Sequence, residues 1–124
     1  MNLVDSSAWL EYFNDDVNAA FFTDPIENAP QAIVPTICLY EVFKKFVQKD
    51  QEDAGLKAIS YMRRGRVVSL DPELTLQAAK TSVELKLSMA DSIIYATARQ
   101  HNAIIWTQDD HFKDLPGVKY TVKK

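Results

Sequence analysis

The sequence has few residues that could cross-link or interrupt a fold. Its single cysteine, Cys38, excludes a disulfide within the chain. Only three glycines and five prolines in 124 residues exclude a collagen-like or low-complexity protein. No apolar run approaches the roughly 18–20 residues of a membrane span, and no signal peptide is recognisable. We therefore expect a cytoplasmic protein with no membrane contact, folded as one domain over residues 1–124.

Excess basic charge is also missing. The formal net charge is −3, which argues against a general nucleic-acid-binding protein. The charge is uneven, because residues 42–70 hold seven Lys and Arg against three acidic residues, a net +4 that leaves −7 for the rest. This basic stretch is either a solvated helical face or a surface for phosphate groups, and charge alone favours neither.

Short apolar runs alternate with segments of helical spacing. They predict strands at 2–5, 32–35, 66–70 and 103–107, with a short strand near 118–120. Helices are predicted at 6–14, 36–49, 52–64, 72–86 and 88–101, with Thr36 as one N-terminal cap and Asp71 before Pro72 as another. This alternation predicts a three-layer α/β/α sandwich around a central, mainly parallel sheet.

Acidic residues lie where such a sheet has its reactive edge, outside the carboxyl ends of the strands. Asp5 follows the first strand, and Asp109 and Asp110 follow the strand at 103–107. Glu41 lies in the second turn of the helix after 32–35, and Asp91 lies in the first turn of its own helix. Four acidic side chains are therefore predicted to converge.

Each acid also has an ordinary structural explanation. Asp5 can cap the helix that follows it, and Ser88-x-x-Asp91 has the form of a capping box. Glu41 precedes Lys45 by four residues, and its helical position is roughly opposite an apolar stripe, which favours an exposed ion pair. The two adjacent aspartates after 107 can be plain loop residues.

Burial and the lack of counter-charge weaken these explanations. Asp91 shares its helix face with Ile94, Tyr95 and Ala98, so an unpaired carboxylate there is costly. No lysine or arginine in the acid-bearing segments is an obvious partner. A divalent cation relieves the repulsion, and ligands that are all oxygen suit Mg²⁺ or Mn²⁺ rather than zinc.

Four segments together resemble one known family. They are LVDSSAWLEYF at 3–13, PTICLYEVF at 35–43, LSMADSIIYATARQ at 87–100 and IIWTQDDHFKDLPGV at 104–118. In this order they resemble the PIN-domain ribonucleases, with the closest likeness to the VapC-type toxins of bacterial toxin–antitoxin pairs. The resemblance extends over essentially the whole chain.

The resemblance implies an endoribonuclease that uses one or two Mg²⁺ or Mn²⁺ ions to hydrolyse RNA phosphodiester bonds. It also implies a cognate antitoxin and a homodimer. The hydroxyls of Ser6, Ser7 and Thr107 fall where the family supports the metal or the substrate phosphate. Lys44 and Lys45, beside Glu41 on the helix surface, are our candidates for binding RNA. The implied catalytic and metal-binding residues are Asp5, Glu41, Asp91 and Asp109, with the choice between Asp109 and Asp110 left open.

Two other interpretations compete with the enzyme. A PIN-like module that binds RNA or protein without useful turnover is the main alternative, and the presence of all four acids disfavours it. A phosphate-receiving regulator or phosphatase is disfavoured because no D-x-D follows the first strand and no lysine follows a late strand. His111 lies near the predicted site and is a further candidate for substrate contact, and Cys38 is expected to be a buried apolar residue.

Overall fold

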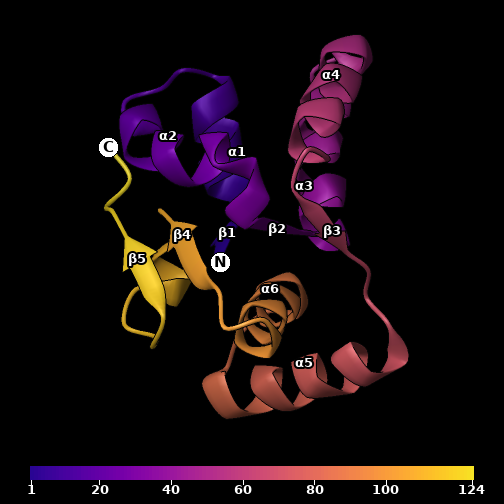
Figure 1. Ribbon diagram of the computed structural model, residues 1–124, viewed down its shortest axis with the longest axis vertical. Helices are drawn as coiled ribbons and strands as arrows, with labels where there is room; N and C mark the ends of the chain where they lie inside the picture. The colour runs from indigo at the N-terminus through magenta and orange to yellow at the C-terminus, as the bar shows by residue number, and fades with distance from the viewer.

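The computed structural model describes all 124 residues as a central sheet with helices on both sides (Figure 1). The strands are β1 (Asn2–Val4), β2 (Ala32–Pro35), β3 (Arg66–Val68), β4 (Ile104–Thr107) and β5 (Val118–Tyr120). The α-helices are α1 (Ser6–Phe13), α2 (Ala19–Glu27), α3 (Thr36–Gln48), α4 (Glu52–Met62), α5 (Pro72–Leu85) and α6 (Met89–Gln100). Two short 3₁₀ helices complete the chain, η1 (Ala29–Gln31) and η2 (Asp110–Phe112).

All five strands are parallel, in the order β3-β2-β1-β4-β5. The helices α1 to α4 lie above the sheet in the view of Figure 1, and α5 and α6 lie below it. The predicted three-layer α/β/α sandwich is therefore confirmed. From β1 the chain continues to β2 on one side, whereas β4 pairs with β1 on the other side. The strand order reverses between β1 and β4, which is where open parallel sheets form their binding crevices.

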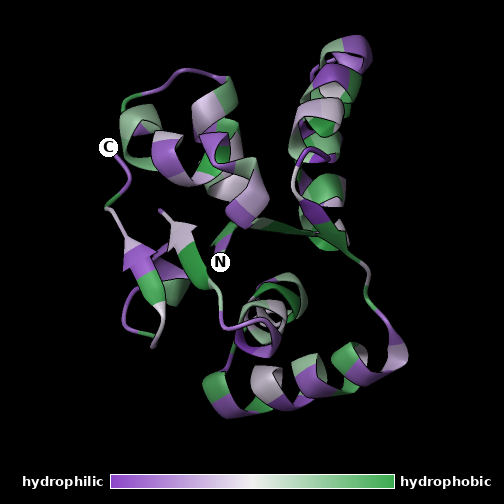
Figure 2. Cartoon of the chain, in the orientation of Figure 1, coloured by the Kyte–Doolittle hydropathy of each residue, from purple (hydrophilic) through white to green (hydrophobic).

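The core consists of apolar side chains from both faces of the sheet. Leu3, Val34 and Ile105, from three adjacent strands, are fully buried. A smaller cluster, which includes Leu74 and Ile93, joins α5 to α6. Figure 2 shows hydrophobic colour along β2 and on parts of β4 and β5, whereas green and purple alternate along the helices. None of the helices combines the length and the apolar character that crossing a bilayer requires.

Three details differ from the predictions. Thr36 does not cap α3, because the helix already begins at Thr36 and its cap position is Pro35, which makes no side-chain cap bond. The third strand ends at Val68 rather than at residue 70. No element was predicted between 15 and 31, yet α2 lies there. Its signal is weak because Pro25 falls inside the helix and the cap residue Asn18 makes no cap bond.

Candidate active site

Asp5 lies at the reversal of strand order, where β1 ends and α1 begins. It caps α1, because its Oδ1 accepts hydrogen bonds from the Ser7 N–H at 2.5 Å and the Ser7 Oγ at 2.8 Å. Its Oδ2 accepts a hydrogen bond from the Thr107 Oγ1 at the end of β4. Asp5 therefore links β1 and β4 at their carboxyl ends. Its side chain both caps α1 and lies at the edge where the acids were predicted to converge.

The four predicted acids line a single cavity of about 200 Å³. Its wall also contains two apolar residues and three polar residues that the sequence predicted. The full lining is Asp5, Ser6, Ser7, Leu10, Glu41, Lys45, Asp91, Ile94 and Asp109. Asp110 is exposed and lies outside this cavity, beside a neighbouring one. The two adjacent aspartates therefore differ in placement, and Asp109 is the one that lies with the other acids.

Glu41 turns toward the cavity rather than into solvent. Its Oε1 accepts a hydrogen bond of 2.7 Å from the Ser6 Oγ, and it makes no ion pair with Lys45. The hydroxyls of Ser6, Ser7 and Thr107 thus each hold a carboxylate of the cavity. In this structure their direct partners are the acids, which fixes the orientation of Asp5 and Glu41.

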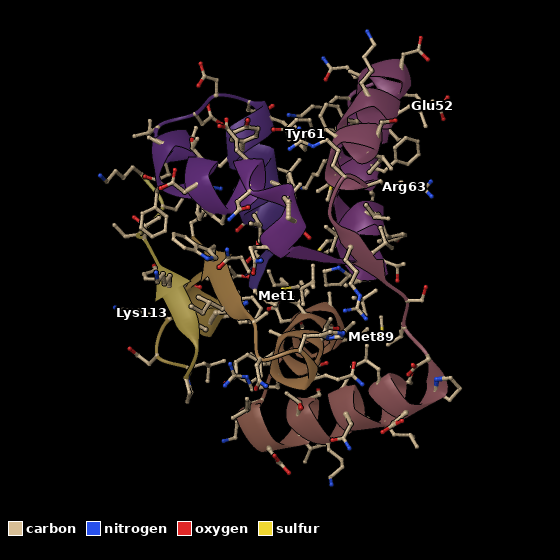
Figure 3. All side chains as sticks on the ribbon, viewed as in Figure 1. Met1, Glu52, Tyr61, Arg63, Met89 and Lys113 are labelled. Carbon is tan, nitrogen blue, oxygen red and sulfur yellow. The ribbon has the colours of Figure 1, made fainter.

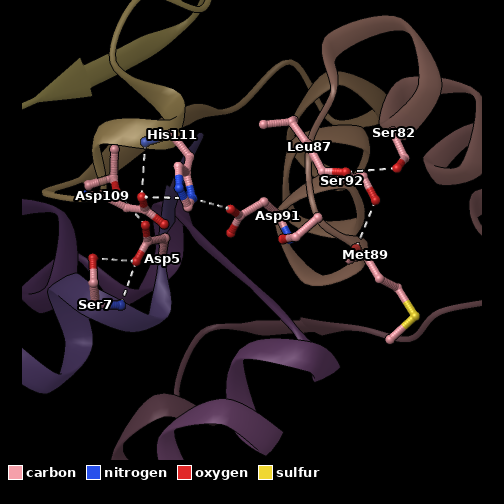
Figure 4. Close-up of polar contacts among 11 residues, drawn as sticks. Asp5, Ser7, Ser82, Leu87, Met89, Asp91, Ser92, Asp109 and His111 are labelled. Atoms are coloured by element: carbon pink, nitrogen blue, oxygen red, sulfur yellow. Dashed lines mark hydrogen bonds and ion pairs between the residues drawn. The ribbon is translucent and has the colours of Figure 1, made fainter.

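Asp91 enters the cavity from the first turn of α6. Ser88 is the cap of this helix, and its Oγ accepts the Asp91 N–H at 3.3 Å. The capping signal in the sequence is therefore real, but it involves the backbone of Asp91. The carboxylate is directed toward the end of β4, where its Oδ2 lies 3.1 Å from the Nδ1 of His111 (Figure 4).

His111 lies between two of the acids (Figure 4). Its Nδ1 is 3.1 Å from Asp91 Oδ2 and 3.3 Å from Asp109 Oδ1, and its side chain is 67% exposed. These are the only ion pairs in the chain, so no lysine or arginine neutralises any of the four acids. The hydrogen bond with Asp91, followed by the charges of Asp109 and Asp91, raises the pKa of His111.

The electrostatics of the acids follow from burial without counter-charge. Asp5 is 3% exposed, and burial raises its pKa to about 6, although the hydrogen bonds from Thr107 and Ser7 oppose the shift. Burial, together with the charge of Asp109, also raises the pKa of Asp91. The same negative charge of Asp109 acts on both carboxyls. A bound cation would reverse these shifts by stabilising the ionised forms.

The donor set fits a divalent cation that prefers oxygen ligands. Carboxylate oxygens of Asp91 and Asp109 and a ring nitrogen of His111 lie within 4.8 Å of one another. Asp5 and Glu41 line the same cavity, and their hydroxyl partners hold them in place. Mg²⁺ and Mn²⁺ accept such carboxylate sites, and Mn²⁺ also accepts an imidazole ligand. His111 was not in the predicted set of four acids, yet its ring nitrogen lies among these carboxylate oxygens.

Comparison with known proteins places the chain in a family. The sequence model of the PIN domain matches residues 3–118. The chain belongs to the PIN-domain family. The resemblance of the four segments is therefore confirmed at the level of the family. No curated protein matches the sequence.

Solved structures share the fold over nearly the full length of this PIN domain. A toxin–antitoxin complex from Klebsiella pneumoniae matches with a TM-score of 0.78 and 24% identity, covering 96% of each chain. VapC20 of Mycobacterium tuberculosis, a toxin that cleaves the sarcin–ricin loop, matches with a TM-score of 0.79 and 19% identity, covering 95% of this chain and 97% of that one. VapBC2 of Rickettsia felis, bound to promoter DNA, matches with a TM-score of 0.74 and 14% identity, covering 98% and 97%.

The basic stretch 42–70 is only partly near the acids of this PIN domain. Lys45 lines the acidic cavity, whereas the Nζ of Lys44 lies 5.7 Å from the ring centre of Tyr40 and is not part of the cavity wall. Figure 3 shows Tyr61 reaching from α4 toward α1, whereas Arg63 points outward from the end of that helix. Of the two lysines predicted to bind RNA, only Lys45 lines the acidic cavity.

A buried polar network behind the acids was not predicted. Glu11 is 6% exposed, and its carboxylate accepts hydrogen bonds from the Asn18 N–H at 2.8 Å and the Gln108 Nε2 at 2.9 Å. The Asn18 Nδ2 donates to the Gln108 Oε1 at 2.9 Å. Gln108 lies between Thr107 and Asp109, so the network anchors the segment that carries them. The only sequence signal is Glu11 itself, an acid on the helix that also carries Trp9.

Proposed function

We propose that this PIN domain is a Mg²⁺- or Mn²⁺-dependent endoribonuclease, acting in the cytoplasm as the toxin of a toxin–antitoxin pair. One observation carries the proposal: four carboxylates line one cavity at the reversal of strand order, with no lysine or arginine paired to them. A chain that needed only helix caps would retain Asp5 and Ser88 but would gain nothing from placing Glu41 and Asp109 in the same cavity.

The roles of the residues follow from their positions. A cation bound here would lower the pKa of a coordinated water and offset negative charge on a phosphate. Asp5 and Asp91 are the central ligands in this proposal, and Glu41 and Asp109 bind the ion directly or through water. Ser6, Ser7 and Thr107 hold Asp5 and Glu41 in the orientation needed for ligation. Lys45, on the wall of the same cavity, attracts the substrate phosphate.

The test is cleavage of total cellular RNA by the purified chain with Mg²⁺, with Mn²⁺ and with EDTA. Asp91→Asn removes one charge with little change in volume, and we expect it to abolish cleavage. Asp53→Asn is the matched control. Asp53 and Asp91 both lie in the first turn of a helix, but Asp53 is exposed on α4 and lies outside the acidic cavity. Discrete fragments that require both metal and Asp91 support the nuclease. Metal-independent cleavage, or full activity in Asp91→Asn, contradicts it.

The partner proposal rests on a separate surface. A mostly apolar groove of about 380 Å³ lies between α1, α3 and α4, with Tyr12, Phe13, Phe46 and Tyr61 on its wall. The similar structures from Klebsiella pneumoniae and Rickettsia felis include toxin–antitoxin assemblies. Grooves of this kind accept an amphipathic helix of a partner, and we propose that the antitoxin occupies it. A homodimer remains a prediction from the family resemblance.

Growth of a bacterial host tests the toxin assignment. We expect expression of the chain to arrest growth and Asp91→Asn to relieve the arrest. Co-expression of a cognate antitoxin should also restore growth, and the antitoxin should co-purify with the chain. Unimpaired growth with well-folded wild-type protein, in a host whose RNA the chain cleaves in vitro, contradicts the toxin role but leaves the nuclease intact.

A further inference from the structure

A second cavity adjoins the acidic one and shares two wall residues with it. It has a volume of about 460 Å³, within the range of about 300–1,000 Å³ common for small-ligand sites. Ser7 and Asp109 belong to both cavities. The remaining wall is formed by residues before β5, at its end and after it: Gln108, Asp110, Tyr120, Val122 and Lys123.

We propose that this second cavity binds the nucleotide next to the cleaved phosphodiester bond of a single-stranded RNA. The base stacks on the ring of Tyr120, and Lys123 contacts a phosphate. This inference rests on the proposed nuclease function and adds a substrate-binding site to it. Aromatic rings beside cationic side chains are the usual means by which proteins hold single-stranded nucleic acid.

The sheet places Tyr120 at the reactive edge. β5 pairs in parallel with β4, and Tyr120 lies opposite Thr107, whose hydroxyl binds Asp5. The carboxyl ends of β1, β4 and β5 therefore form one continuous edge, on which the acids come first and Tyr120 follows. A chain bound across the acids in this direction reaches Tyr120 within the adjoining cavity.

The segment after β5 is anchored, so the cavity has a defined wall. The Thr121 N–H donates to the Thr107 carbonyl oxygen at 3.1 Å. The Asn18 Nδ2 donates to the Val122 carbonyl oxygen at 3.0 Å and to Gln108 at 2.9 Å. The buried network around Glu11 thus holds both the loop of Asp109 and the tail that carries Lys123.

Charge also favours a phosphate-containing ligand here. Lys123 is exposed and makes no ion pair, since the two ion pairs of the chain both involve His111. Lys45, on α3 after β2, lines the acidic cavity, and Lys123, after β5, lines the adjoining one. A cation on the wall of each of the two adjoining cavities suits a polyanion that extends from one cavity into the other. Asp110 on the cavity wall is an acceptor for the hydroxyl or amino groups of a nucleotide.

The first experiment measures binding without requiring turnover. Single-stranded homopolymer RNAs of about eight nucleotides are titrated into Asp91→Asn protein, with and without Tyr120→Ala. We expect Tyr120→Ala to weaken binding by about 5- to 150-fold, the measured range for losing one stacked base. Tyr120→Phe keeps the ring and should restore most of the affinity. Equal RNA affinity of the Asp91→Asn protein with and without Tyr120→Ala would overturn the proposal.

The second experiment places the contact on the substrate. Oligonucleotides are shortened one nucleotide at a time from each end around the mapped cleavage site. The loss caused by Tyr120→Ala should disappear when the nucleotide on one side is removed, and should persist for truncations of the other end. A constant loss with every substrate indicates a structural role of Tyr120 and overturns the assignment.

Salt dependence tests Lys123 in the same binding assay. Lys123→Gln should reduce the slope of log K against log salt by about 0.7, the value for one phosphate contact on a single strand. Lys80→Gln is the matched control, because Lys80 is exposed on α5 below the sheet (Figure 1). An unchanged slope in Lys123→Gln refutes the phosphate contact. If the wild-type protein cleaves no RNA, that result contradicts the proposed nuclease function. The binding assay with Tyr120→Ala still tests the nucleotide site separately.

Discussion

Replacing Asp5 by asparagine should stabilise the metal-free protein while removing its activity. Asp5 is almost completely buried without a cation beside it, and burial raises the pKa of its carboxyl from 3.8 to about 6. At a pH between these two pKa values, Asp5 holds a proton in the folded chain and releases it in the unfolded chain. The free energy of unfolding therefore falls as the pH rises from about 4 to about 6. The loss is complete at neutral pH and amounts to about 3 kcal/mol, at about 1.4 kcal/mol for each pH unit.

Asparagine avoids this loss but keeps the shape. Its amide oxygen can still accept the hydrogen bonds from Ser7 that cap α1. Because the bonds to an ionised acceptor are stronger than those to an amide, we expect a net gain of about 1–2 kcal/mol rather than the full amount. In a chain of this size the melting temperature should rise by roughly 4–12 °C.

The assay is urea denaturation in EDTA at about pH 7.5 and about pH 4.5. Asp5→Asn should be more stable at the higher pH and close to the wild type at the lower one, where Asp5 carries a proton. Asp71→Asn is the control, because Asp71 caps α5 with its Oδ1 at 2.8 Å from the Leu74 N–H but is exposed. Adding Mg²⁺ should stabilise the wild type and reverse the order. An Asp5→Asn protein no more stable than the wild type in EDTA at pH 7.5 would refute the reasoning.

Three further outcomes are expected. The raised pKa of His111 means that protonated His111 stabilises the folded chain below a pH of about 6.5, and this stability is lost as the pH rises through its folded pKa. His111→Ala should therefore destabilise the metal-free chain at low pH only, which urea titrations at several pH values measure. Lys45→Ala should weaken RNA binding and flatten its salt dependence more than Lys44→Ala, and equal effects in a filter-binding assay would contradict the placement of Lys45. Glu11→Ala leaves the Asn18 N–H and the Gln108 amide without their acceptor, so denaturation should show a loss of about 2–4 kcal/mol; a neutral substitution would mean that water replaces the carboxylate.

The sequence predicted the local elements well where the signals are local. Periodicity identified the helices that carry Glu41 and Asp91, and Asp71 before Pro72 marked the beginning of α5. The capping residues Asp5 and Ser88 were recognised for the same reason, because a cap bonds to the backbone two or three residues away. The helix α2 was missed, since Pro25 interrupts its pattern and Asn18 is engaged in a distant hydrogen bond instead of a cap.

The candidate site could be predicted only as a set of residues at one edge. Helical spacing alone made Glu41 look exposed, and nothing in the sequence indicates that Ser6 turns it into the cavity. His111 between Asp91 and Asp109, and Tyr120 beside Thr107, depend on contacts across many residues of sequence. Likewise, the basic stretch 42–70 looked uniform, but only Lys45 of its residues lines the acidic cavity.

By itself, the sequence determined the alternation of strands and helices, the family, and the placement of acids after strands, because these depend on neighbours along the chain. The tertiary structure decided which strands pair, and therefore that Asp5 and Thr107 meet where the strand order reverses. It also decided which carboxylates are buried without a cation. Burial and charge pairing arise from residues far apart in sequence, so their energies exist only once the sheet has assembled.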